Sequence, residues 1–116
     1  MASDIAVMQG RDEGPLHSKF TDDPELAEPL DAFVLGLAER IDRLQDADAA
    51  GQLEAVGRLG HELAADAGAV GHELFAEVAA RVARAADEAK GEDAHAELLT
   101  LTDLARRVRM GHRGSM

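Results

Sequence analysis

The chain has 116 residues, 46% of them hydrophobic, and a formal net charge of −11 at pH 7. Its length suits a single domain built around one core. The negative charge repels phosphate backbones and anionic lipid, which argues against nucleic-acid and membrane-surface partners. The absence of cysteine excludes disulfides, cysteine–metal sites and thiol chemistry. Because there is neither a signal peptide nor an apolar run of about 20 residues, we expect a cytoplasmic protein.

Aromatic residues make up only 3% of the chain, and tryptophan and tyrosine are absent. A core of leucine, valine and alanine favours closely packed helices. The β-branched and aromatic residues are also too scattered to supply several strands. We therefore predict an all-α protein.

The first predicted helix follows a leader over residues 1–15, which mixes glycine, proline and charge and is expected to be flexible. The segment from Thr21 to Glu25 indicates a helix start, because acidic residues flank Pro24 in the first turn. Pro29 either kinks this helix or separates a short first helix from a longer second one. The apolar stripe has spacings of three and four, and consists of Leu26, Leu30, Phe33, Val34, Leu37, Ile41 and Leu44.

Three further helices are predicted. A turn over residues 46–51 precedes a helix over 52–67, which ends in a break at 68–71. The next helix spans 72–90, with Gly91 as the C-cap glycine that ends it. The last helix runs from about residue 93 to about 110, which leaves 111–116 as a flexible polar tail. Together these elements predict an antiparallel up-down four-helix bundle over residues 16–110, with a short extra N-terminal helix. The inward stripes of these three helices consist of Leu53, Val56, Gly60, Leu63 and Ala67; of Phe75, Val78, Val82, Ala85 and Ala89; and of Leu98, Leu101, Ala105 and Val108.

His61 lies on the outward flank of the second long helix. On a wheel of about 100° per residue, it points about 120° away from the centre of that helix's apolar stripe. A glycine inside a helix costs roughly 1 kcal/mol relative to alanine, so the small residues around His61 need an explanation. They either reflect a chain rich in alanine and glycine, or keep the imidazole accessible to another protein, as a phosphoryl acceptor requires. Its neighbours on the same face are Gly57, Ala64, Ala65 and Gly68.

The segment His61-Glu62-Leu63-Ala64-Ala65 is followed by small residues and by glycines at positions 68 and 71. Its order and spacing resemble the His-x-Leu-Lys-Gly signature of the histidine-containing phosphotransfer (HPt) domains of multistep phosphorelays. The segment over residues 20–28 resembles the opening of many bacterial members, and the match covers about residues 16–109. The resemblance implies that His61 exchanges a phosphoryl group with receiver-domain aspartates. It also implies that Mg²⁺ belongs to the receiver and that this domain needs no cofactor.

Two positions depart from the signature, since Ala64 stands where the family has lysine and Ala65 where it has glycine. The lysine can balance phosphate charge, so its absence is expected to weaken retention or transfer of the group. Arg58, one turn before the histidine, is a candidate phosphate contact, whereas Glu54 and Glu62 oppose phosphate charge. The expected receiver-docking surface consists of Gly57, Arg58, Ala64, Ala65 and Gly68.

The leading hypothesis is a monomeric phosphorelay carrier, whose partners are a response-regulator receiver domain, a hybrid histidine kinase, or both. The alternative is a non-catalytic module that docks such partners without carrying phosphate. A third possibility is a homodimer formed through the small-residue face.

A metal site is not expected. The string that begins at His61 would match the zinc-protease pattern HExxH only with a histidine at position 65, which is alanine. His72 and His95 are expected to lie solvated near helix starts. The acidic pairs at 22–23 and at 46 and 48 suit helix starts and turns better than acid–base catalysis.

Overall fold

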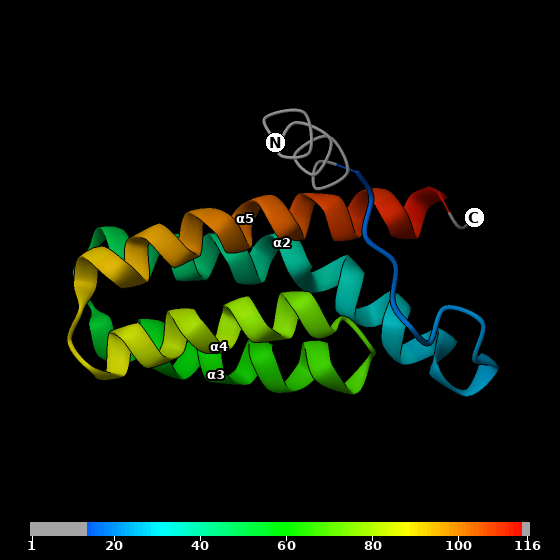
Figure 1. The fold of residues 1–116 in the computed structure, drawn as a ribbon, viewed down its shortest axis with the longest axis horizontal. Helices are drawn as coiled ribbons and strands as arrows, with labels where there is room; N and C mark the ends of the chain where they lie inside the picture. The colour runs from blue at the N-terminus through cyan, green and yellow to red at the C-terminus, as the bar shows by residue number, and fades with distance from the viewer. Residues whose placement is uncertain (1–13, 115–116) are drawn as a thin grey trace, which may run out of the picture.

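The four long helices form an antiparallel bundle in which each helix packs on its neighbours in the sequence and α5 returns to pack on α2 (Figure 1). The computed structural model describes residues 14–114, and the side chains of residues 14–112. A 3-10 turn, η1 (Pro24–Leu26), is followed by α2 (Ala27–Ala49), α3 (Leu53–Ala69), α4 (Glu73–Asp87) and α5 (Gly91–Gly114). The predicted all-α four-helix bundle is confirmed, and the short extra N-terminal helix is the single turn η1.

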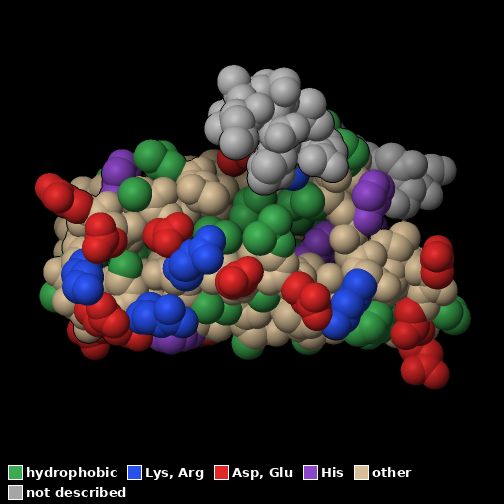
Figure 2. All heavy atoms as spheres, viewed as in Figure 1, with side chains coloured by type: hydrophobic (Ala, Val, Ile, Leu, Met, Phe, Trp, Pro, Cys, Tyr) green, Lys and Arg blue, Asp and Glu red, His purple; other side chains and the backbone are tan. Residues whose placement is uncertain are grey.

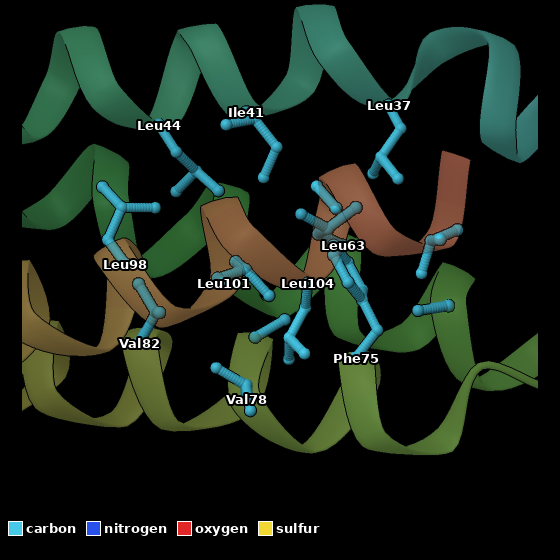
Figure 3. Close-up of a cluster of buried hydrophobic side chains, with 14 of the residues drawn as sticks. Leu37, Ile41, Leu44, Leu63, Phe75, Val78, Val82, Leu98, Leu101 and Leu104 are labelled. Atoms are coloured by element: carbon cyan, nitrogen blue, oxygen red, sulfur yellow. The ribbon is translucent and has the colours of Figure 1, made fainter. Parts of the chain in front are cut away.

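The predicted apolar stripes form the core. Leucine and isoleucine side chains of α2 point toward those of α5, while Leu63 and Phe75 close the core from α3 and α4 (Figure 3). Leu37, Leu44 and Leu101 have no exposed surface. Four expected core residues differ, since Leu26, Leu53 and Ala85 are only partly buried and Ala89 is exposed in the turn after α4.

The helices α2, α3 and α4 end in the same left-handed capping pattern. The second residue after each helix has positive φ: 70° at Gly51, 84° at Gly71 and 59° at Ala89. In the last case, Ala89 donates its N–H to the carbonyl of Ala86 at 3.0 Å, and Lys90 donates to that of Ala85 at 2.8 Å. These bonds satisfy carbonyls that a helix end otherwise leaves unpaired.

This pattern corrects three expected boundaries. Helix α2 continues through most of the expected turn and ends at Ala49, and α3 continues to Ala69. Gly91 is the first residue of α5 and does not cap α4, because Ala89 already makes the left-handed turn. Pro29 lies in the first turn of α2, where its missing N–H costs no helical hydrogen bond, so it neither kinks nor divides the helix.

We expect Ala89→Gly to stabilise the protein by about 1 kcal/mol. Alanine at positive φ carries a steric cost of roughly 1–2 kcal/mol that glycine avoids, which exceeds the extra entropy that glycine loses on folding. Urea unfolding followed by far-ultraviolet circular dichroism measures the change. The matched control, Ala96→Gly at an exposed interior position of α5, is expected to lose about 1 kcal/mol. Destabilisation by both changes would contradict the strain at Ala89.

Residues 14–23, here called the N-terminal strap, cross the C-terminal part of α5. Arg107 is buried, and its Nε donates to the carbonyl of Gly14 at 2.7 Å. The N–H of Leu16 in turn donates to the carbonyl of Arg107 at 2.9 Å. A Cβ at Gly111 would lie 2.0 Å from the carbonyl oxygen of Leu16, so the strap can pass only because this residue is glycine.

These contacts explain why α5 is longer than expected. Gly111 was expected to begin a flexible tail, but it is buried and α5 continues to Gly114. The side chain of Arg107 holds the strap against this part of α5. The expected leader over residues 1–15 lies outside the described residues, except for its last two positions.

No helix in the described part of the chain is both long enough and apolar enough to cross a membrane. Acidic and basic side chains are interspersed over the face seen in Figure 2, with apolar side chains between them. Three large hydrophobic side chains among the described residues are exposed, one each on α2, α4 and α5: Leu35, Leu74 and Leu99.

Candidate functional site

His61 projects from the outer face of α3. Its side chain is 59% exposed, whereas Val56, Gly60, Leu63 and Ala67 of the same helix are buried. The helical period therefore places the imidazole where the sequence pattern predicted, on the surface and away from the core.

The His61 ring is held by a carboxylate from the neighbouring helix. Its Nε2 lies 2.7 Å from Oδ2 of Asp87, the last residue of α4. A carboxylate oxygen can only accept, so this geometry places the proton on Nε2 and leaves the lone pair on Nδ1. Within the described part of the chain, the ring makes no second hydrogen bond.

Sequence reasoning missed Asp87. The two residues lie 26 positions apart, and no motif connects them. Hairpin symmetry does not pair them either, because His61 lies in the middle of α3 and Asp87 is the last residue of α4, farther from the turn at Gly71.

Gly57 is buried beneath this pair, which corrects its expected place on an exposed docking surface. A Cβ at Gly57 would lie 2.5 Å from Oδ1 of Asp87 and 3.8 Å from the carbonyl of Ala83. This glycine therefore makes room for the carboxylate that holds His61. The wheel placed Gly57 on the face of His61 but could not show that α4 packs against that edge of the face.

Gly60, one turn along, brings the two helix backbones together. A Cβ there would lie 3.0 Å from Cβ of Ala83 and 3.3 Å from the carbonyl of Ala79. Its expected inward position is confirmed by its burial. The two interior glycines of α3 thus have separate purposes, since Gly60 permits close packing and Gly57 accommodates a polar side chain.

The other small residues line the open side of His61. Ala65 and Gly68 are exposed and Ala64 is half-buried, so the residues that follow His61 on its own face of α3 are small. Arg58 is exposed, and its Nη1 lies 3.9 Å from Oε2 of Glu62. At this distance in solvent the pair is weak, so the guanidinium can turn toward another anion at little cost.

His72 is buried at 5% exposure, so the expectation that it is solvated is wrong. Its ring stacks on Phe33 with 6.0 Å between centroids, beneath the N-terminal strap. The pKa of His72 is lowered to about 4, chiefly by burial and also by the nearby charges of His112 and then His17. A helix start can be covered by a distant segment, which helical periodicity does not reveal.

Two other histidines pair with carboxylates. Nδ1 of His95 lies 2.6 Å from Asp48 Oδ2, and Nε2 of His112 lies 2.8 Å from Asp31 Oδ1. In the part of the chain that the structure describes, no three histidine or acidic side chains are grouped so that they could hold a metal ion.

A hollow of about 730 Å³ between the ends of α2, α3 and α5 is lined by Leu53, Leu98 and residues near them, and His61 is not among them. An exposed imidazole on a convex helix face cannot enclose a small substrate, but another protein can bring a reacting group to it. Neither the family models, nor the curated proteins, nor the solved structures with which this chain was compared gave a match.

Proposed function

We propose that this protein is a phosphorelay carrier, in which His61 accepts a phosphoryl group from one receiver-domain aspartate and passes it to another. The observation that carries the proposal is the exposed imidazole on the outer face of a four-helix bundle, held by Asp87 and bordered on its open side by Ala64, Ala65 and Gly68. The HPt-like order of residues around His61 supports the same function.

The chemistry is a direct phosphoryl transfer. The lone pair of an imidazole nitrogen attacks the phosphorus of an aspartyl phosphate, the bond between phosphorus and the acyl oxygen breaks, and the receiver regains its carboxylate. The reverse step delivers the group to a second receiver. This chain would supply the nucleophile and an accessible face, and Arg58 is proposed as the cation that contacts the phosphoryl oxygens. Mg²⁺ is proposed to belong to the receiver.

The alternative function is a module that docks receivers or a histidine kinase without carrying phosphate. Ala64 favours it, because no lysine stands there to offset the phosphoryl charge, while Glu62 competes for Arg58. A third function, homodimerisation, would cover the exposed part of the same face. The three functions differ in which proteins bind this face in solution and in whether His61 carries phosphate.

We expect His61→Gln to abolish phosphoryl acceptance. The protein is incubated with a panel of phosphorylated receiver domains, and also with phosphoramidate as a small donor. Wild type should acquire a phosphate that is stable in base and labile in acid, and the variant should remain at background because it lacks the nucleophile. The matched control is His95→Gln, which removes another exposed histidine paired with a carboxylate and should leave labelling unchanged.

The contrary results are equally specific. Receiver binding without label from any donor would support the docking module and reject the carrier. A dimer that buries His61 and binds no receiver would support the third function. Label that persists in His61→Gln would assign the phosphate to another residue.

A further inference from the structure

The hydrogen bond between His61 and Asp87 distinguishes the two ring nitrogens. Nε2, the outer nitrogen, faces Asp87 Oδ2 at 2.7 Å and carries the proton. Nδ1 keeps its lone pair and has no partner in the described part of the chain. Only a nitrogen with a free lone pair can attack phosphorus, so the two atoms are not equivalent as acceptors.

We infer that the phosphoryl group is carried on Nδ1 of His61, and that Asp87 is the positioning residue that selects this atom by holding the proton on Nε2. This inference rests on the proposed function. It goes further by naming the atom that reacts and by giving Asp87 and Gly57 roles in that choice.

Charge supports the same atom. Reaction at Nε2 requires the hydrogen bond to Asp87 to break, and it leaves a phosphoryl group beside a carboxylate of the same sign. Reaction at Nδ1 places the group on the other side of the ring and leaves the hydrogen bond in place. As the ring gains positive charge during attack, the carboxylate 2.7 Å away stabilises it.

The step at Nδ1 is balanced. The Nδ1 lone pair forms the bond to phosphorus, and the electron pair of the broken P–O bond leaves with the receiver's carboxylate. The proton on Nε2 stays in its hydrogen bond to Asp87 throughout, so the product is a ring phosphorylated at Nδ1 and protonated at Nε2. No oxidant, reductant or further reactant is needed.

Gly57 makes this arrangement possible. Because its missing Cβ would lie 2.5 Å from Asp87 Oδ1, Gly57→Ala must push the carboxylate aside. The displaced group is the end of a flexible side chain, so the helix can keep its fold while the contact with His61 is lost. This variant therefore tests the effect of moving the Asp87 carboxylate while the carboxylate itself is still present.

The experiment determines which nitrogen is phosphorylated. Protein labelled with ¹⁵N in histidine is treated with phosphoramidate, and the isomers are assigned by ³¹P–¹⁵N coupling. We expect an excess of the Nδ1 isomer of about fivefold in wild type, a modest bias because both partners are exposed. Before phosphorylation, ¹⁵N shifts should show the Nε2–H tautomer. Asp87→Ala and Gly57→Ala should each lower the excess of the Nδ1 isomer and the preference for the Nε2–H tautomer. Asp103→Asn, at a distant exposed acid on α5, should change neither quantity.

Each contrary result has one meaning. Phosphate mainly on Nε2 in wild type overturns the inference and leaves the carrier function intact. Phosphate on Nδ1 that is unaffected by Asp87→Ala overturns the role of Asp87. Absence of any phosphohistidine, with phosphoramidate and with receivers, rejects the proposed function and the inference with it. Circular dichroism of each variant shows that a changed isomer ratio comes from folded protein.

Discussion

Acidification from pH 6.5 to pH 4 is expected to lower the free energy of unfolding by about 3 kcal/mol through His72 alone. In the folded protein the pKa of His72 is lowered to about 4, first by burial and then by the charges of His112 and His17. In the unfolded chain it returns to its ordinary value near 6.5. Between these two values the unfolded state binds the additional proton, so this stabilising contribution is complete above pH 6.5 and is lost as the pH falls toward 4.

The measurement is urea unfolding at a series of pH values, followed by circular dichroism because the chain has no tryptophan or tyrosine. The control variant is His72→Leu, which keeps an apolar side chain against Phe33 and cannot take up a proton. Its stability should fall less steeply over the same range, and the difference between the two slopes isolates His72. A His72 titration midpoint near 6.5 by NMR, or equal slopes, would contradict the effect of burial.

Phe75→Ala is expected to cost about 3–5 kcal/mol, the range for truncating a buried aromatic residue. Phe75 is 1% exposed and meets Phe33 edge to face, with 5.9 Å between ring centroids. Phe33 in turn stacks on His72. The chain has only three phenylalanines, so two of them form the centre of the core at this end of the bundle.

The same unfolding experiment at pH 7 measures this loss. Phe75→Leu keeps most of the volume and should cost only about 1–2 kcal/mol, while Leu99→Ala at an exposed position should stay within about 0.5 kcal/mol of wild type. A loss below about 1 kcal/mol in Phe75→Ala would show that this part of the core collapses around the gap and does not depend on the aromatic pair.

The glycines show which turns the local sequence predicts correctly and which it does not. Gly51 and Gly71 each follow an apolar stripe and form the left-handed turns that end α2 and α3, as a glycine after a helix predicts. Ala89 forms the third such turn, although Gly91 lies two residues away. Local preference favoured Gly91, but the packing of α4 and α5 sets where the turn falls. Gly111 looked like the start of a tail and is instead the place where the strap crosses α5.

The sequence by itself determined the fold class, the inward stripes and the outward position of His61, because these depend on helical period and on which side chains avoid water. Tertiary structure alone decided what His61 meets. It places Asp87 against Nε2 of His61, and it puts Gly57 where the missing side chain leaves room for that carboxylate. It also buries His72 under the N-terminal strap. These contacts join residues far apart along the chain, and one helix's periodicity carries no information about the partner that packs on its edge.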